Sequence, residues 1–495
     1  MATAGRVSTR PVAATRRPRP PVIVALVPVG LVAILLSHLI DDVLAGAAVI
    51  VLWLIWVLLY EQHRLPVLPM AMSFQWTQVT CGLFYCGLTG RELEAVYASD
   101  YRPMVAIGLV CVVMITIGLA AGSRFASGRE PEEGPERRYV LSWRALMMVY
   151  IGATLLSSGL RSLAWSIPGL TQGLLAIGYA RFGVLLLLFR RLTHPRMRWG
   201  WCGGLLGFEL AIGMTGYFAG FREPLILATL ALIETSDWRA PAHWLRLGSL
   251  VSAMLVLGVL WMGIRGTYRA ELDDGRLTSS RTERLDRVGA LSSEWFGANI
   301  DRMTEDLDRL VDRMWVIYYP ALAVSRVPSV LPHTDGQIML DALKHLVTPR
   351  ILFPGKGALL SDSEMVRTYS GVYVAGAEQN TTIAFGYAAE SYVDFGIPLM
   401  FLPAFLFGVF MGVAYRLTFR VLQTEELATG FITVVFWLSL YLFERSWVRT
   451  LGLSITLLVY LGPLTLVLDR IVLSKIRARR RRAANTTTHR RPAVS

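Results

Sequence analysis

The residues best suited to chemistry are arginines that stand beside long apolar segments. Arg222 lies in the stretch Gly220-Phe221-Arg222-Glu223-Pro224, directly ahead of an apolar run. Because proline suits the first turn of a helix, we expect Arg222 to stand beside the exposed N–H groups and positive dipole end of a helix, where a phosphate binds well. The alternative is a local Arg222–Glu223 ion pair or a contact with a lipid headgroup.

Further arginines are expected at the same side of the molecule. Arg265 and Arg269 follow the ninth apolar segment, and Arg161 lies in the loop after the fifth. Several guanidinium groups in one outer cavity would bind a diphosphate bidentately and stabilise it as a leaving group. Arg181 falls inside an apolar segment, so it either marks a misplaced segment boundary or lines a cavity.

Two acidic pairs have spacings that could indicate a metal–diphosphate site or a catalytic pair of carboxylates. Asp306-Leu307-Asp308 has the spacing of metal–diphosphate sites, but residues two apart on a helix point to different sides, which favours a surface pair. Asp41-Asp42 follows the first apolar segment, in a loop too short to make a catalytic pair the favoured interpretation. The chain has no GxxxxGK[ST], GxGxxG, HExxH or GxSxG motif, so we predict neither a metal nor a cofactor.

The composition defines what must position these groups. The chain has 495 residues, of which 54% are hydrophobic and 17% charged, and its mean hydropathy is +0.48. These values exclude a disordered chain, a coiled coil and a secreted disulfide scaffold, and they disfavour a soluble enzyme. The four cysteines lie in apolar segments without metal-type spacing. The sequence therefore predicts an all-α polytopic membrane protein.

About twelve segments are long and apolar enough to span a bilayer, which takes about 20 residues each. They lie near 22–40, 43–59, 69–89, 103–121, 141–160, 170–189, 199–215, 217–234, 246–264, 396–415, 427–443 and 448–468. The weakest are 69–89, which carries Gln75 and Gln78, and 217–234, which carries Arg222 and Glu223.

Lys and Arg residues support an even number of spans with both termini cytoplasmic, because they cluster in alternate loops. The short predicted outer loops hold only scattered single arginines: Arg91, Arg102, Arg161, Arg222, Arg445 and Arg449. The resulting organisation is a basic cytoplasmic tail (1–21), nine spans (22–264), an extracytoplasmic loop (265–395), three spans (396–470) and an Arg-rich cytoplasmic tail (471–495). The net charge of +13 is concentrated at the two ends, which points to anionic membrane lipids rather than nucleic acid.

The extracytoplasmic loop begins with a charged, helix-compatible stretch. Apolar residues from Leu285 to Ile317 recur at three- and four-residue spacing, and acidic residues cover the opposite face. This pattern predicts an amphipathic helix that lies on the bilayer or caps the bundle. From Pro320 onward the loop is irregular and rich in proline and glycine, as expected of a binding surface.

Two stretches of this loop carry a resemblance to a known family. Residues 348–356, TPRILFPGK, and 389–396, AESYVDFG, resemble the "PR-hydrophobic-P-x-K" and "GE-x-Y-x-(N/D)-FG" elements of bacterial O-antigen and exopolysaccharide repeat-unit polymerases, the Wzy-like proteins. Residues 220–223 are similar to their "G-x-R-G" element, although Glu223 replaces the usual glycine. Gly357 stands where proline is commoner. The likeness covers the pattern of spans throughout, but motif detail only from about 314 to 415 and around 222.

This resemblance implies a GT-C-like helical bundle in the bacterial plasma membrane and glycosyl transfer on its outer face. The donor would be a polyprenyl-diphosphate-linked oligosaccharide, and no nucleotide sugar or metal would be needed. The residues assigned to the diphosphate are Arg222, Arg265, Arg350 and Lys356, with Arg161 a weaker candidate. Glu390 is the predicted base; the alternative is a helix N-terminal carboxylate. For Arg350 and Lys356 the alternative is an interfacial loop charge.

Two other functions fit the same pattern. A lipid-linked glycan ligase would share the fold and the arginines, and differs in making a single transfer rather than a ladder of products. A twelve-span transporter or flippase for lipid-linked oligosaccharide also fits, although no internal repeat is visible in the sequence. A chain-length regulator and a flippase of the same pathway are the protein partners that the resemblance implies.

Overall fold

The computed structural model shows an assembly of helices. It describes residues 22–61, 64–91, 100–126, 141–167, 169–193, 198–216, 220–235, 241–275, 277, 280–348, 353, 355–357, 359–379 and 381–488. Every regular element in these residues is a helix. The predicted all-α class is therefore confirmed for the part of the chain that is described.

Each of the twelve predicted apolar segments contains helix. They correspond to α1 (Val22–Ile40), α2 (Val43–Leu59), α3 (Val67–Thr89), α5 (Arg102–Phe125), α6 (Trp143–Ser166), α7 (Thr171–Gly178) with α8 (Ala180–Thr193), α9 (Trp199–Met214), α10 (Arg222–Thr235), α11 (Pro241–Asp273), α18 (Phe401–Val421), α19 (Glu425–Leu440) and α20 (Trp447–Thr488). Six of these are long and apolar enough to cross a membrane by length and composition: α5, α6, α7 with α8, α11, α18 and α20.

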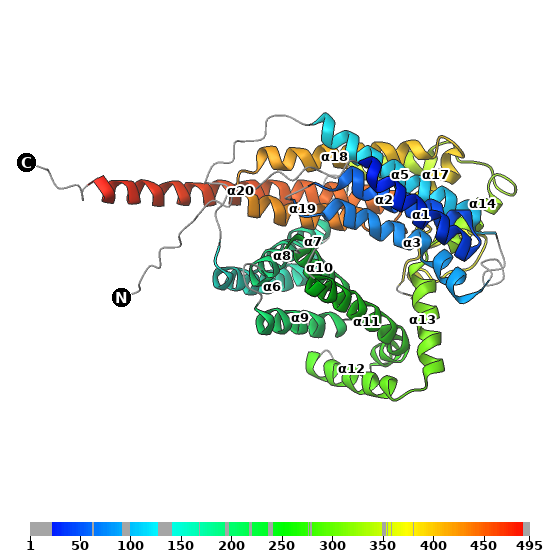
Figure 1. The fold of residues 1–495 in the computed structure, drawn as a ribbon, viewed down its shortest axis with the longest axis horizontal. Helices are drawn as coiled ribbons and strands as arrows, with labels where there is room; N and C mark the ends of the chain where they lie inside the picture. Colours follow the sequence, from blue (N-terminus) through cyan, green and yellow to red (C-terminus); the bar gives the residue numbers. More distant parts are fainter. Residues whose placement is uncertain are drawn as a thin grey trace, which may run out of the picture.

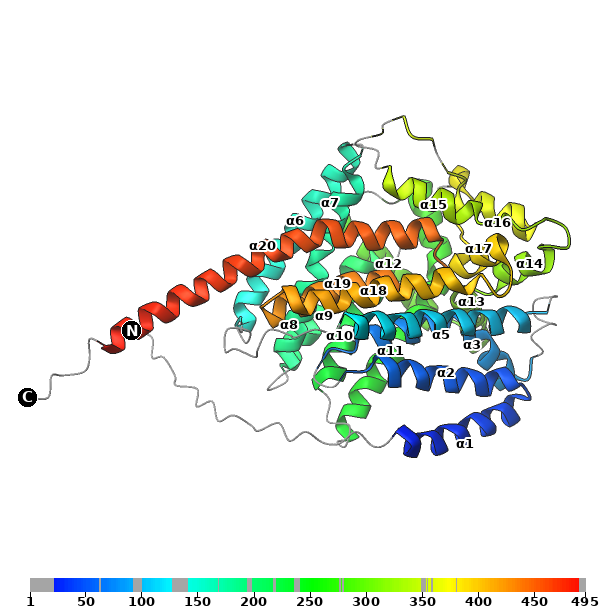
Figure 2. The ribbon, with the colours of Figure 1, turned by 90° about the horizontal axis from the view of Figure 1, so that it is seen from above.

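Helices α5 and α18 pack closely against each other along one side of the bundle. Gly118 and Gly122 of α5 face Gly408 and Gly412 of α18, and a Cβ added at Gly118 would lie 2.9 Å from the backbone nitrogen of Val409. Such GxxxG spacing lets two apolar helices bring their backbones into contact. Figures 1 and 2 show the two helices side by side along the long axis of the molecule.

The predicted amphipathic helix over 285–317 is two helices, α12 (Arg281–Phe296) and α13 (Ile300–Met314). They meet at a corner where the indole N–H of Trp295 donates to the buried carboxylate of Asp306 at 2.8 Å. With α11, which continues past residue 265 to Asp273, these helices form a lobe beneath the bundle in Figure 1. The lobe has an apolar core of its own.

The rest of the predicted outer loop is a layer of short helices. These are α14 (Tyr318–Arg326), α15 (Gln337–Val347), α16 (Asp362–Ser370), the 3-10 turn η1 (Ala377–Gln379) and α17 (Gly386–Phe395). They lie at one end of the bundle, which we call the loop end, whereas the C-terminal part of α20 projects from the opposite tail end (Figures 1 and 2). At about 1.5 Å per residue, the 42 residues of α20 exceed the thickness of a bilayer core.

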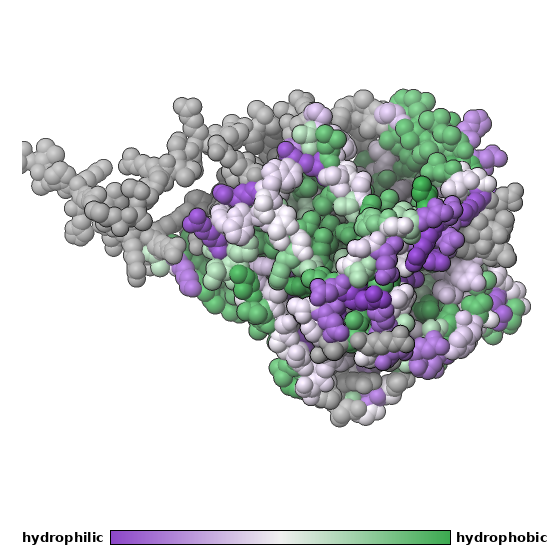
Figure 3. All heavy atoms as spheres, turned by 90° about the horizontal axis from the view of Figure 1, so that it is seen from below, coloured by the Kyte–Doolittle hydropathy of each residue, from purple (hydrophilic) through white to green (hydrophobic). Residues whose placement is uncertain are grey.

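Large apolar side chains cover broad areas of the surface, interrupted by hydrophilic stripes (Figure 3). On α6, Met148, Leu155 and Trp165 are 71%, 70% and 75% exposed. Soluble monomers seldom expose contiguous apolar patches of this kind. Such surfaces suit contact with lipid chains.

Candidate functional site

The connector between α19 and α20, residues 441–446, is the point where the loop end and the bundle meet. Gln78 of α3 accepts a hydrogen bond from the backbone of Phe443 at 2.7 Å, and Gln75 donates to the carbonyl of Leu440. Tyr387 of α17 donates to Gln75 at 2.7 Å. The two glutamines that weaken the third apolar segment therefore hold this connector in place.

Arg222 is the first residue of α10 and contacts the connector. Its Nη2 donates to the hydroxyl of Tyr441 at 2.8 Å and to Glu223 at 3.1 Å, and its guanidinium lies 4.9 Å from the centre of the Tyr441 ring. The side chain is 38% exposed. The structure thus shows both features that the sequence analysis gave as alternatives for Arg222: the position at a helix N-terminus and the local ion pair with Glu223.

Arg445 approaches the same tyrosine. Its guanidinium lies 5.6 Å from the centre of the Tyr441 ring and donates to the carbonyl of Leu438 at 2.7 Å. Trp437 stacks on Tyr441 with ring centres 5.1 Å apart. We call Arg222, Tyr441 and Arg445 the arginine–tyrosine cluster. The sequence analysis placed Arg445 only among single loop arginines, because nothing local in the sequence connects it to Arg222.

Arg265 lies half-buried on α11 and faces other cations. Its charged neighbours are the guanidinium groups of Arg269, Arg309 and Arg313. Arg309 pairs with Asp306 at 2.8 Å and Arg313 with Glu444 of the connector at 2.9 Å. Among the described residues, Arg265 has no carboxylate partner. Glu444 thus joins the α11–α13 lobe to the connector that carries the arginine–tyrosine cluster.

Glu390 of α17 is 3% exposed and caps the last helix, α20. Its Oε2 accepts from the backbone N–H of Trp447, the first residue of α20, at 2.7 Å. Burial raises the pKa of Glu390 to about 8; the Trp447 N–H and Arg449 oppose this rise, while Asp362 and Asp394 add to it. The helix N-terminal carboxylate considered from the sequence is therefore present, on α20 rather than on α17.

The neighbours of Glu390 in the matched element are also anchors. Ser391 accepts from the Trp447 indole at 2.8 Å, and the Tyr392 hydroxyl donates to the carbonyl of Val327 at 3.1 Å. Asp394 accepts from two backbone N–H groups in the first turn of α15, at 3.0 and 2.7 Å. Side chains of this one short helix thus hold α20, the segment after α14, and α15.

Asp362 provides a second carboxyl group near that of Glu390. It lies at the start of α16, its side chain is 13% exposed, and Arg449 of α20 approaches it at 2.8 Å. Burial raises the pKa of Asp362, while Arg449 and Ser446 act against that shift. The sequence analysis did not select Asp362 and treated Arg449 as a single loop arginine, since their pairing joins residues far apart in the chain.

Lys356 and Arg350 belong to the other matched stretch. Lys356 donates to the carbonyls of His345 and, at 2.8 Å, Thr348, which lie at the C-terminal end of α15. A lysine in this position satisfies free carbonyls and favours the negative dipole end of the helix. Arg350 lies outside the described residues. No described contact joins Lys356 to Arg222 or Arg265.

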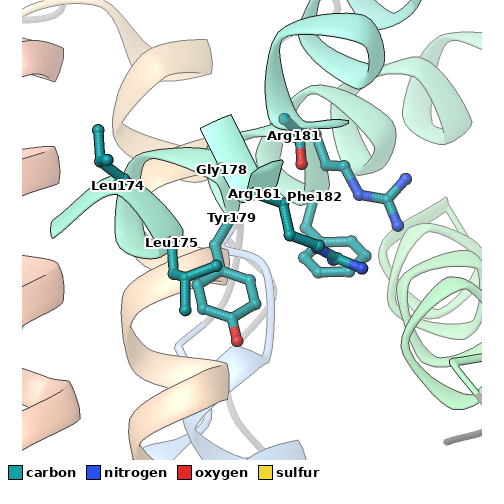
Figure 4. Close-up of a pocket in the computed structure, with 8 residues that line it drawn as sticks. Arg161, Leu174, Leu175, Gly178, Tyr179, Arg181 and Phe182 are labelled. Carbon is teal, nitrogen blue, oxygen red and sulfur yellow. The ribbon is translucent and has the colours of Figure 1, made fainter. Parts of the chain in front are cut away.

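Arg161 and Arg181 line a separate pocket between α6, α7 and α8 (Figure 4). Arg181 pairs with Glu209 of α9 at 2.9 Å, and Glu209, only 1% exposed, also accepts from Tyr150. Arg181 therefore lines a pocket, which is one of the two possibilities that the sequence left open. The sequence analysis missed Glu209, although it stands alone in the seventh apolar segment.

The two acidic pairs have structural partners. Asp306 is fully buried beneath Trp295, whereas Asp308 accepts from Tyr85 and pairs with Arg91 at 3.3 Å. They point to different sides as predicted, but the expectation of a surface pair is wrong for Asp306. Asp42 caps α2 by accepting from Leu44 at 2.8 Å.

These features define a helical membrane protein with cationic groups gathered at its loop end. A scan of protein-family models, a search of curated proteins and a search of solved structures each find no match to this chain.

Proposed function

We propose that this protein is an integral-membrane glycosyltransferase of the repeat-unit polymerase type, acting on polyprenyl-diphosphate-linked oligosaccharides. The observation that carries the proposal is the arginine–tyrosine cluster, where the guanidinium groups of Arg222, on α10, and Arg445, in the connector, meet on one ring at the loop end. A departing diphosphate needs cationic stabilisation in a site of this kind. The resemblance of residues 348–356 and 389–396 to the polymerase elements supports the same function.

The proposal includes a topology. Twelve crossings with both termini cytoplasmic would place the loop end outside a bacterial plasma membrane, where lipid-linked repeat units are polymerised. The contrast between clustered arginines in alternate loops and single arginines in the others supports this orientation. Residues 265–395 would then be the extracytoplasmic part.

In the proposed reaction, a hydroxyl of one lipid-linked glycan attacks the anomeric carbon of another. The new carbon–oxygen bond forms as the bond to the diphosphate breaks, and the diphosphate leaves with the electron pair. Arg222 and Arg445 would bind that diphosphate, with Arg265 as a further cation. The hydroxyl proton would pass to Glu390, whose raised pKa suits proton transfer near neutral pH once the carboxyl has ionised.

Arg350 and Lys356 take a secondary place in this proposal. The two carbonyl contacts of Lys356 support a role in holding the end of α15 rather than direct contact with the diphosphate. Arg350, which follows Thr348 by two residues, stays assigned to the diphosphate by resemblance alone. Arg161 faces a different pocket and is left out of the diphosphate site.

The test uses the purified full-length protein in nanodiscs with a polyprenyl-diphosphate-linked repeat unit and no nucleotide. We expect a ladder of products and one free polyprenyl diphosphate released for each linkage formed. A single transfer without a ladder would replace polymerase by ligase. If no carrier is released from any lipid-linked glycan, while the same lipid moves across the membrane of proteoliposomes, the chain is a transporter and the proposal fails.

A further inference from the structure

The pocket between α6, α7 and α8 contains a cation that the proposed reaction does not use. It is lined by Ser157, Arg161, Leu174, Leu175, Gly178, Tyr179, Arg181 and Phe182. Figure 4 shows Arg161 and Arg181 extending to the same side, whereas Leu174 points the opposite way. A Cβ at Gly178 would lie 3.3 Å from the Ser157 hydroxyl, so glycine there lets α7 lie close to α6.

The pocket has two arginines but one neighbouring carboxylate, so one positive charge is not balanced. The Arg181 guanidinium is neutralised by Glu209 at 2.9 Å. Arg161 is exposed, and no described residue forms a hydrogen bond or an ion pair with it. Two guanidinium groups and one carboxylate therefore give a site that a singly charged anion would complete. A diphosphate would bring excess negative charge.

The surroundings of the pocket indicate where that anion comes from. The same helix α6 exposes Leu155, Leu156 and Trp165 at 70%, 59% and 75%. Exposed tryptophan at the end of an apolar helix is typical of the headgroup level of a bilayer, and Arg161 lies about one helical turn from Trp165. Leu174, Leu175 and Phe182 add apolar walls beside Ser157 and Tyr179, and the exposed apolar face of α6 outside the pocket suits acyl chains.

We propose that this pocket binds the headgroup phosphate of a monoanionic phospholipid, with Arg161 as the direct charge partner and Arg181, held by Glu209, as the second donor. The guanidinium of Arg161 would form charge-assisted hydrogen bonds to the phosphodiester, while the exposed apolar side chains of α6 contact the lipid chains. This site is independent of the proposed glycosyl transfer, so either proposal can fail without the other.

The test is lipid binding to the full-length protein in detergent, followed by native mass spectrometry during titration with phosphatidylglycerol, phosphatidylcholine or polyprenyl diphosphate. We expect phosphatidylglycerol to be retained most strongly. Arg161→Gln should weaken its binding about tenfold or more, the usual loss for a charged hydrogen bond. Arg102→Gln is the matched control, because Arg102 is also exposed but pairs with Asp42; it should change binding less than about twofold.

Three results would overturn the proposal. Equal losses for the Arg161 and Arg102 variants would show a diffuse surface attraction. Equal retention of phosphatidylglycerol and phosphatidylcholine would show that the pocket does not distinguish lipids by the charge of their headgroups. Tighter, Arg161-dependent binding of polyprenyl diphosphate would assign the pocket to a substrate instead. As a second variant, Glu209→Gln should raise the charge of the pocket and shift its preference toward doubly charged phosphatidic acid, and an unchanged preference would remove Arg181 from the site.

Discussion

The arginines at the two ends of the helical bundle differ in the partners that they contact. At the tail end, Arg190 of α8 donates through two nitrogens to Glu234 of α10, and Arg191 pairs with Glu426 of α19. At the loop end, Arg222 and Arg445 lie against the Tyr441 ring, with a single hydrogen bond from Arg222 to Glu223, and Arg265 faces other arginines. Two further loop-end arginines, Arg313 and Arg449, do pair with carboxylates.

The difference separates cations that hold helices together from cations that remain able to bind an anion. A guanidinium held bidentately by a carboxylate is neutralised, and an incoming anion must first displace that partner. A guanidinium against an aromatic ring keeps its net charge and several N–H donors. Unneutralised charge in a protein interior opposes folding unless a ligand supplies the opposite charge. We therefore expect the loop end to bind the anionic substrate of the proposed reaction.

The largest effect is expected from Arg222→Gln. Losing a guanidinium that stabilises a departing diphosphate should lower the rate of carrier release about 100- to 1,000-fold. Release is measured at saturating lipid-linked repeat unit, with folding checked by thermal unfolding in detergent. Tyr441→Phe is the control, since it keeps the ring and removes only one acceptor; we expect at most about a threefold loss. Near-normal release by the Arg222 variant would exclude it from the site.

The second prediction concerns Glu390 and pH. If Glu390 is the base, activity should rise as its carboxyl ionises, reach half its maximum near pH 8, the value to which burial raises its pKa, and level off at higher pH. Glu390→Gln should lower activity about 100-fold and abolish this dependence. A near-normal rate would contradict the base role, since glutamine still offers an oxygen to the Trp447 N–H.

The same pKa predicts a change in stability. A carboxyl whose pKa is higher in the folded protein than in the unfolded chain contributes stability that is complete below the ordinary value, about 4.5, and is lost as the pH rises through about 8. The unfolding temperature of the native protein should therefore fall between pH 5 and pH 8.5. It should fall less for Glu390→Gln, whose side chain stays neutral throughout.

The third prediction uses Arg265, the loop-end cation with arginine neighbours. Arg265→Gln should weaken the apparent affinity for the lipid-linked substrate about tenfold, as expected for one charged contact. Because it also removes repulsion from Arg309 and Arg313, the unfolding temperature should stay equal or rise slightly. A fall in stability with unchanged affinity would show that Arg265 has a structural role.

How far the sequence predicted these features depends on the range of the contacts. Each apolar run became a helix because burial in lipid or protein and satisfaction of the backbone are local demands. The first position of Arg222 in α10 followed from the proline two residues later. The contact of Arg222 with Tyr441 and that of Asp362 with Arg449 could not be predicted, because they join residues 219 and 87 positions apart.

The motifs of the predicted outer loop show a second limit of prediction from sequence. The acidic and aromatic residues of 389–396 suggested chemistry by resemblance, yet in the structure Tyr392 and Asp394 make backbone contacts that fix neighbouring segments. Lys356 likewise contacts helix carbonyls. A polar motif residue has the same appearance in sequence whether it binds a ligand or caps a helix, and only its partners distinguish the two.

The smallest effect on activity is expected at the tail end, where Arg190→Gln provides the counterpart to Arg222→Gln. Both Arg190 and Glu234 have 21% exposed side chains, so removing the arginine leaves a half-buried carboxylate without its partner. Stability should fall by about 1–3 kcal/mol, measured as a lower unfolding temperature, while carrier release per folded molecule stays within about twofold. The double variant Arg190→Gln with Glu234→Gln should regain most of the lost stability, because no unpaired charge remains. Activity that falls with Arg190→Gln as steeply as with Arg222→Gln would erase the distinction between the two ends, and the tail-end pairs would then have to take part in the function.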